Sequence, residues 1–184
     1  MDTLPIGKDG KIQTAASGPY PPLEVSGPQP HYARLLGISM ASPKSEMTSI
    51  CQYLYNSWTL PGDMGWTEEL HDVMRRIAMV EMHHFDMLGA LIVKLGGDPR
   101  YLSVARRPMM WDGHMVTYNR TPAMAFKENI LLEQSAIDTY RRQIAAINDP
   151  HITAVLRRII ADEEVHLTIF KVFLARTDAG SHSK

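Results

Sequence analysis

The chain has 184 residues, of which 45% are hydrophobic, and its formal net charge is −1. This length suits one compact domain, and the near-zero charge gives no reason to expect nucleic acid or an anionic membrane surface as a partner. Because Cys51 is the single cysteine, an internal disulfide and a CxxC-type zinc or rubredoxin site are excluded. There is no long apolar run and no signal-peptide pattern, so we expect a cytoplasmic protein without a membrane span.

The predicted elements begin with an extended arm at residues 1–30, which is rich in proline and glycine and has no core of its own. One helical domain at 31–176 and a C-terminal tail at 177–184 are expected to follow. Apolar periodicity predicts a short helix at 31–40 and four longer helices, at 43–58, 67–95, 122–147 and 151–176. The connection at 98–121 is too long for a tight turn. The chain therefore predicts an all-α, antiparallel four-helix bundle with a long crossover between its second and third helices.

Helix ends carry recognisable signals. Ser42 followed by Pro43 predicts an N-cap and a first helical residue, which opens the helix at 43–58 or kinks a longer helix there. The pair Gly96-Gly97 is expected to end the second bundle helix, and Asp149-Pro150 to separate the last two.

The inward-facing stripe of every predicted bundle helix is interrupted by groups that are costly to bury. Apolar residues recur along each helix in steps of three and four, as expected of a side that faces a core. At some positions of this pattern a glutamate or a histidine replaces the apolar residue. These residues are Glu46, Glu81, His84, Glu133, Glu163 and His166.

A pair of metal ions explains these interruptions. Buried carboxylates are strongly unfavourable unless cations compensate them, and two divalent ions would balance four glutamates. The i, i+3 spacing puts Glu81 beside His84, and Glu163 beside His166. One Glu from each of two helices plus Glu-x-x-His from each of the other two is the ligand set of dinuclear carboxylate bundles. The alternative is a buried salt-bridge network, but too few basic residues share the stripes to neutralise four glutamates.

Other residues near the stripes admit more than one interpretation. A third Glu-x-x-His pair, Glu68 and His71, lies at the start of a helix and off the stripe, so we interpret it as capping and surface charge. Tyr53 and Tyr140 each follow a stripe glutamate by seven residues, and are either hydrogen-bond partners of the metal site or core aromatics. Asp162 either orients a histidine from across the bundle or is an ordinary exposed aspartate.

These motifs resemble the four metal-binding helices of the ferritin-like superfamily. The resemblance covers roughly residues 40–175 and is carried by Ser45-Glu46 with Gln52-Tyr53, Val80-Glu81-Met82-His83-His84, Glu133-Gln134-Ser135-Ala136-Ile137 with Tyr140, and Asp162-Glu163-Glu164-Val165-His166. The opening from Tyr20 to Leu36 is similar, more weakly, to short manganese-catalase-like and rubrerythrin-like members. Rubrerythrins proper carry a rubredoxin domain, which one cysteine excludes, and an extra glutamate where this chain has Ala136. Bacterioferritins carry an aspartate where Val80 stands.

The resemblance implies a role for each ligand. The terminal ligands would be Glu46 and Glu133, the glutamates that bridge or approach both metals Glu81 and Glu163, and the imidazole ligands, one per metal, His84 and His166. In manganese catalases the glutamate that corresponds to Glu163 can instead carry protons. We therefore take Glu163, Tyr53 and Tyr140 as the candidate catalytic residues.

Oxygen and nitrogen ligands without thiolate suit iron or manganese, so the expected cofactor is two metal ions per chain, iron or manganese. The leading hypothesis is a non-haem dinuclear oxidoreductase, catalase- or peroxidase-like, that acts on hydrogen peroxide. One alternative is a ferroxidase that oxidises Fe(II) with dioxygen and stores iron. Another is a coat or assembly protein that retains a metal site. We expect a homo-oligomer, a dimer or larger, whose partner is a small-molecule oxidant, with neither nucleic acid nor membrane bound.

Overall fold

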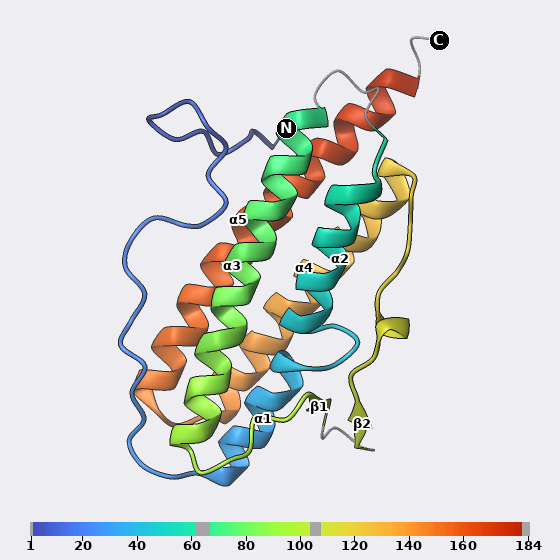
Figure 1. Ribbon diagram of the computed structural model, residues 1–184. Coiled ribbons are helices and arrows are strands. Elements are labelled where there is room, and N and C mark those ends of the chain that lie inside the picture. The colour runs from blue at the N-terminus through green and yellow to red at the C-terminus, as the bar shows by residue number, and fades with distance from the viewer. Residues whose placement is uncertain (1, 62–66, 104–107, 182–184) are drawn as a thin grey trace.

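The computed structural model describes residues 2–61, 67–103 and 108–181, and this part of the chain folds into an α-helical bundle (Figure 1). Its helices are α1 Pro30–Met40, α2 Glu46–Thr59, α3 Thr67–Lys94, α4 Pro122–Ala146 and α5 Pro150–Ser181. Helices α2 and α3 form one packed pair and α4 and α5 the other, while α1 packs mainly on α3. The four-helix bundle with a long crossover after its second helix, predicted from the sequence, is confirmed.

Three prolines begin helices. Pro30, Pro122 and Pro150 are the first residues of α1, α4 and α5, where a missing N–H is not needed and the fixed φ already suits a helix. Before Pro150, the Asp149 carboxylate accepts from the N–H of His151 at 3.0 Å, so it caps α5.

Two predicted helix boundaries are wrong. Helix α2 begins at Glu46, with Ser45 at its N-cap, and not at Pro43. The carbonyl of Ser42 accepts from the Ser45 and Thr48 hydroxyls at 2.8 and 2.7 Å, which holds a turn ahead of the helix. At the other end of the chain, α5 continues through Ser181 instead of ending at 176 as predicted. A single glycine after that point costs only about 1 kcal/mol in a helix, so it does not stop one.

The crossover contains short elements that the sequence analysis did not predict. Strands β1 Leu102–Ser103 and β2 Met109–Met110 pair antiparallel, and a 3₁₀ turn, η1, spans Gly113–Met115. Two-residue strands are too short to show alternation, so they carry no periodic signal. The Trp111 indole N–H donates to the Thr48 hydroxyl at 2.9 Å, which ties the crossover to α2.

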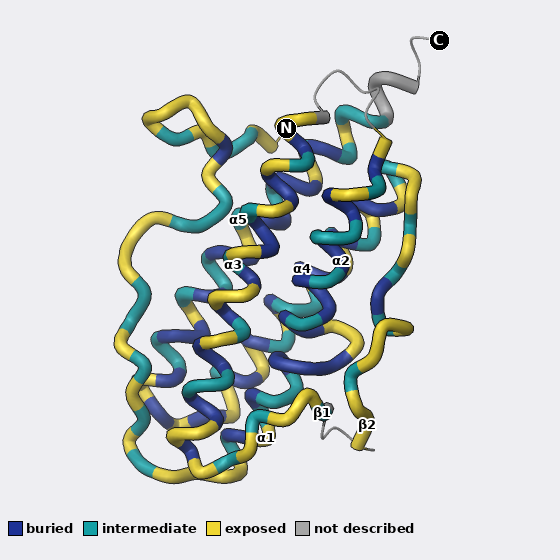
Figure 2. The backbone as a smooth tube through the Cα atoms, in the orientation of Figure 1, coloured by how far each residue is buried: buried dark blue, intermediate teal, exposed yellow. Residues whose placement is uncertain are grey.

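The core consists of two apolar clusters with a layer of buried polar side chains between them. Figure 2 shows buried residues recurring along each helix of the bundle. One cluster includes Ile77 and Phe170, and the other Leu88 and Ile159. Along both α3 and α5 the Glu-x-x-His pair falls between the residues of the two clusters. Within the described residues, no helix is both long and apolar enough to span a membrane.

The N-terminal arm is extended, as predicted, and runs along α3 and α5 (Figure 1). Ile12 is buried in the first cluster at 2% exposure. The carbonyl of Ile12 accepts from Arg76 of α3 at 2.6 Å, and the carbonyl of Ala16 accepts from Arg158 of α5 at 2.8 Å. The arm is therefore held against the helices that carry both histidines of the polar layer.

Candidate metal centre

The polar layer brings together side chains from all four bundle helices. Helix α2 contributes one glutamate, α4 another, and α3 and α5 a Glu-x-x-His pair each, in which one helical turn places the imidazole beside the carboxylate. Every one of these side chains is at most 3% exposed. They are the six residues singled out in the sequence, Glu46, Glu81, His84, Glu133, Glu163 and His166.

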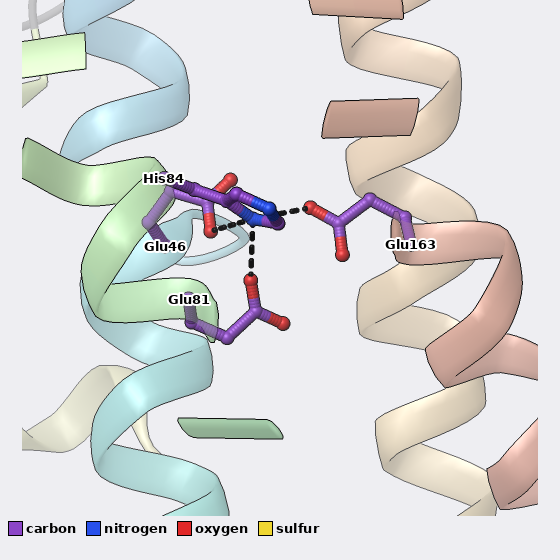
Figure 3. A group of neighbouring side chains, drawn as sticks. All are labelled: Glu46, Glu81, His84 and Glu163. Carbon is purple, nitrogen blue, oxygen red and sulfur yellow. Dashed lines mark hydrogen bonds and ion pairs between the residues drawn. The ribbon is translucent and has the colours of Figure 1, made fainter. Parts of the chain in front are cut away.

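The first half of the layer surrounds Nδ1 of His84 (Figure 3). Glu81 Oε2 lies 3.0 Å from this nitrogen, Glu163 Oε1 lies 3.4 Å away, and Glu46 Oε2 lies 3.6 Å away. One ligand atom from each of the four residues fits within 4.8 Å of all the others. This spacing can accommodate one metal ion with three carboxylates and one imidazole.

The second half repeats this arrangement around Nδ1 of His166. Glu163 Oε2 lies 3.1 Å from this nitrogen, Glu81 Oε1 lies 3.2 Å away, and Glu133 Oε1 lies 3.8 Å away. The centroids of the His84 and His166 rings are 6.3 Å apart. Glu81 and Glu163 thus direct one oxygen toward each imidazole, so the two groups can hold two metal ions side by side.

Two buried carboxylate oxygens indicate whether cations fit this layer. Among the described residues, Glu81 Oε1 and Glu163 Oε1 find no hydrogen bond of good geometry, although both are shielded from water and lie 3.2 and 3.4 Å from an imidazole Nδ1. Leaving a buried carboxylate oxygen unpaired is costly, and a divalent cation between the carboxylates removes that cost. Both atoms belong to the two glutamates shared between the groups. The donor set therefore fits a dinuclear metal site.

The electrostatics of the layer reflect crowded carboxylates. Burial, together with the neighbouring Glu81 and Glu163, holds the pKa of both Glu46 and Glu133 well above the usual range. Burial also acts to raise the pKa of Glu81, but His166 and then His84 outweigh it, so the pKa of Glu81 is lowered. The carboxylates thus compete for positive charge, which two divalent ions would supply.

Two tyrosines cross between the helices that carry the terminal glutamates. Tyr53 of α2 donates its O–H to Glu133 of α4, and Tyr140 of α4 donates to Glu46 of α2. Both rings are fully buried, and burial raises the pKa of each phenol well above its usual value. Both interpretations left open by the sequence hold: each ring belongs to an apolar core cluster, and each hydroxyl donates to the glutamate of the opposite helix.

The outer nitrogens of the two histidines have different partners. Nε2 of His84 lies 3.0 Å from Asp162 Oδ2, so Asp162 is the orienting carboxylate and not an exposed residue. Nε2 of His166 lies 2.8 Å from the main-chain carbonyl oxygen of Thr14. The sequence analysis missed Thr14, and no sequence signal could have indicated it, because any residue offers a carbonyl.

The third Glu-x-x-His pair lies outside the layer, as predicted. Glu68 is exposed, and Nε2 of the half-buried His71 lies 3.2 Å from the carbonyl oxygen of Leu60. Cys51 is half-buried, and burial raises the pKa of its thiol, so the thiolate that would react or bind metal is disfavoured.

A four-helix bundle with a buried carboxylate–histidine layer is typical of dinuclear carboxylate proteins, and a comparison with known families gives a match of the same kind. The model of the ferritin-like domain matches residues 43–179. The chain therefore belongs to the ferritin-like domain family.

Several known proteins are similar to this chain. KatB, a manganese catalase from Anabaena, has a TM-score of 0.78 and 19% identity, over 89% of this chain and 80% of KatB. The diiron bacterioferritin of Desulfovibrio desulfuricans has a TM-score of 0.67 and 22% identity over 81% of each chain. Its curated sequence is 27% identical over 155 residues, which is 83% of this chain and 77% of that relative. A dodecameric thioferritin from Bacteroides fragilis has a TM-score of 0.67 and 19% identity, over 83% of this chain and 89% of that one. At these identities the structural likeness shows the fold alone.

Proposed function

We propose that this chain is a non-haem dinuclear metal oxidoreductase, catalase- or peroxidase-like, that acts on hydrogen peroxide. The observation that carries the proposal is the pair of buried carboxylate–imidazole groups that share Glu81 and Glu163. In this proposal Glu46 and His84 complete the first metal position. Glu133 and His166 complete the second.

Iron or manganese suits these ligands, because each position offers carboxylate oxygens and one imidazole and no thiolate. When bound, a redox-active metal pair exchanges two electrons with peroxide, so that one peroxide is reduced to two waters and the next is oxidised to dioxygen. The two charges on each ion also offset the four glutamates of the layer.

The residues around the metals would hold them in a defined geometry. Glu81 and Glu163 each direct one oxygen toward either imidazole, so both would serve as ligands at the two metal positions. Tyr53 and Tyr140 donate to the terminal glutamates and leave the remaining lone pairs of these carboxylates for metal. With Glu163, these tyrosines are the candidate catalytic residues, because each donates its O–H to a terminal glutamate of the layer.

Two reasons support hydrogen peroxide over dioxygen as the proposed oxidant. The superposition is better with the manganese catalase, at a TM-score of 0.78, than with the bacterioferritin, at 0.67. The alternation between peroxide reduction and peroxide oxidation also needs no separate reductant, and this chain lacks the cysteines of a rubredoxin-type electron donor.

A ferroxidase that oxidises Fe(II) and stores iron is the second candidate. It is favoured by the 27% sequence identity with the Desulfovibrio desulfuricans bacterioferritin. Since the Bacteroides fragilis relative is dodecameric, we also expect this chain to form a homo-oligomer.

The test is oxygen release from hydrogen peroxide, measured with an oxygen electrode on manganese-loaded and iron-loaded protein without added reductant. We expect release from at least one form. If neither form releases oxygen and Fe(II) is rapidly oxidised by dioxygen, the ferroxidase assignment replaces this one.

Two variants connect the activity to the site. Because Glu163 reaches both positions, Glu163→Gln is expected to lower metal content and oxygen release together. His71→Ala removes a histidine of the same spacing class outside the layer, and is expected to change neither. Loss of metal in His71→Ala to the extent seen in His84→Ala would contradict the assignment of the ligands.

A further inference from the structure

The arm segment 12–20 meets the metal layer from its outer side. Thr14 offers its main-chain carbonyl oxygen to Nε2 of the fully buried His166 at 2.8 Å. Ala16 donates its main-chain N–H to Asp162 Oδ1 at 2.7 Å, and Tyr20 donates its O–H to Asp162 Oδ2 at 2.7 Å. The arm therefore reaches one histidine directly and the other through the carboxylate behind it.

The contact at Thr14 determines which nitrogen of His166 carries the proton. A carbonyl oxygen can only accept a hydrogen bond, so Nε2 must be the protonated nitrogen of the neutral ring. In that neutral form Nδ1, which faces Glu163 at 3.1 Å and Glu81 at 3.2 Å, would offer its lone pair to a metal in place of a proton. A neutral imidazole in this tautomer is the form that binds metal through Nδ1.

Asp162 accepts from Nε2 of His84 in the same way, and the arm helps to keep this carboxylate in place. Its oxygens accept from Ala16 N–H and Tyr20 O–H, and Arg158 of α5 forms an ion pair with it. The Arg158 guanidinium lies 4.1 Å from the centroid of the Tyr20 ring and donates to the Ala16 carbonyl at 2.8 Å. Arm and helix thus hold the carboxylate from two sides.

The dependence on the arm differs between the two histidines. If the arm leaves the bundle, His84 keeps Asp162, which belongs to α5 and retains Arg158 as a partner. His166 loses the acceptor of its outer N–H, because that acceptor is the arm itself. Arm docking should therefore matter most for the metal beside His166.

We propose that residues 12–20 are part of the metal centre, as a strap that positions both histidines and controls metal retention, above all at the His166 position. This inference rests on the metal-binding part of the proposed function and not on the choice of peroxide as oxidant. Thr14 acts through its main chain, while Tyr20 and Arg158 are positioning residues. Because linkage is reciprocal, bound metal must in turn favour the docked arm.

The experiment compares Mn²⁺ binding to full-length variants by calorimetric titration. Ile12→Asp puts a charge at the buried anchor of the arm and undocks the strap without altering any ligand. We expect it to weaken the Mn²⁺ site beside His166 about 10- to 100-fold, the usual effect of removing the outer partner of a histidine ligand, and the site beside His84 less, because Asp162 keeps Arg158. In a His166→Ala background, Ile12→Asp should have a much smaller effect. Helical circular dichroism reports whether the bundle is intact.

Tyr20→Phe tests the contact to Asp162 separately and keeps the aromatic ring. It should weaken the Mn²⁺ site beside His84 and leave the other nearly unchanged. Tyr32→Phe is the matched control, since the Tyr32 hydroxyl accepts from the Asn148 N–H at 3.1 Å and Asn148 is not one of the six layer residues. It should alter neither site.

Hydrogen exchange of the arm provides a readout that a purely structural role would not change. Added Mn²⁺ should slow exchange at residues 12–20 in the wild type, and much less in His166→Ala, where only the link through Asp162 remains. Unchanged Mn²⁺ affinity in both Ile12→Asp and Tyr20→Phe, or an arm whose exchange ignores Mn²⁺, would overturn the strap while leaving the proposed function standing. A wild-type chain that binds no Mn²⁺ or Fe²⁺ at this layer would overturn both.

Discussion

At the scale of single residues, the crossed tyrosines distinguish the two metal positions. Tyr53 shares α2 with Glu46 but donates to Glu133, while Tyr140 shares α4 with Glu133 but donates to Glu46. Each hydroxyl therefore holds the carboxylate at the position opposite to the one that its own helix supplies. The pairing links α2 and α4, whereas the strap contacts α3 and α5.

This crossing predicts the effect of removing each hydroxyl. Tyr53→Phe should lower metal affinity at the position of Glu133 and His166, and Tyr140→Phe should lower it at the position of Glu46. We expect a change of about 10- to 100-fold in each, because the glutamate that loses its hydrogen bond is no longer oriented. Metal titration of each variant combined with His84→Ala, which removes one position, tests the assignment. If Tyr53→Phe weakens the Glu46 side instead, the crossed pairing is wrong.

Asp149 is a second residue whose effect can be isolated, because it is not one of the six layer residues and stands directly before α5. Its carboxylate accepts from His151 N–H at 3.0 Å and from Ser26 N–H of the arm at 2.7 Å. Burial acts to raise the pKa of Asp149, but these main-chain donors, Ser26 first, outweigh it and lower the pKa. The folded protein thus prefers the ionised form.

The sign of the pH dependence follows from that lowered pKa. The stabilisation is fully present above the unfolded pKa, about 3.9, and is lost as the pH falls through the lower folded pKa. Asp149→Asn keeps an acceptor oxygen but removes the charge. The free energy of unfolding in urea and chelator should differ between wild type and variant by a constant amount above pH ~4, and the difference should shrink below it. A difference that grows on acidification would contradict this role.

At the scale of elements, the packing of α1 on the end of α3 depends on a glycine. A Cβ added to Gly97 would lie 2.6 Å from the Ala33 Cβ of α1 and 3.0 Å from the Ile92 Cγ2. The preceding Gly96 has φ = 79°, which ends α3 and turns the chain. The glycine pair therefore allows two helices to approach at a turn.

We expect Gly97→Ala to destabilise the fold by about 1–3 kcal/mol, because a core contact of this kind can be relieved only by moving a helix. Gly37→Ala is the matched control: it lies within α1, and a Cβ there would meet nothing within 4 Å. That change should be neutral or stabilising by about 0.5–1 kcal/mol. Chemical denaturation measures both, and equal effects would show that α1 does not pack as described.

At the scale of the whole molecule, metal binding and folding stability are coupled. The layer gathers ligands from α2, α3, α4 and α5, so only the folded chain presents them together. A ligand that binds only the folded state adds about 2.7 kcal/mol per site when its free concentration is 100 times Kd. For a chain of this size, two sites should raise Tm by about 10–20 °C.

Removing metal with a chelator should therefore lower Tm by that amount, as measured by calorimetry. His84→Ala should lose part of the difference, and His71→Ala should keep all of it, since His71 lies outside the layer. A chelator-insensitive Tm would be evidence against metal at the layer.

The sequence by itself determined the bundle and most of the layer. Both follow from local periodicity: the position of Glu81 one turn before His84 requires only that the segment be helical, and the apolar stripe indicates which face is buried. The helix ends were harder to predict. Ser42 was expected to cap α2 through its side chain, but in the structure its main-chain carbonyl instead accepts hydrogen bonds in a turn before the helix. The competing arrangement was visible only once the Ser45 and Thr48 hydroxyls were placed.

Only the tertiary structure decided which partners lie outside the ligands. Tyr53 could be matched to Glu133 only when α2 and α4 were set side by side. The partner of His166 is a carbonyl of Thr14, 152 residues away in the chain. Because every residue carries a main-chain carbonyl, the residue type at position 14 does not indicate that it partners His166. The path of the arm across α3 and α5 decides which carbonyl reaches the histidine.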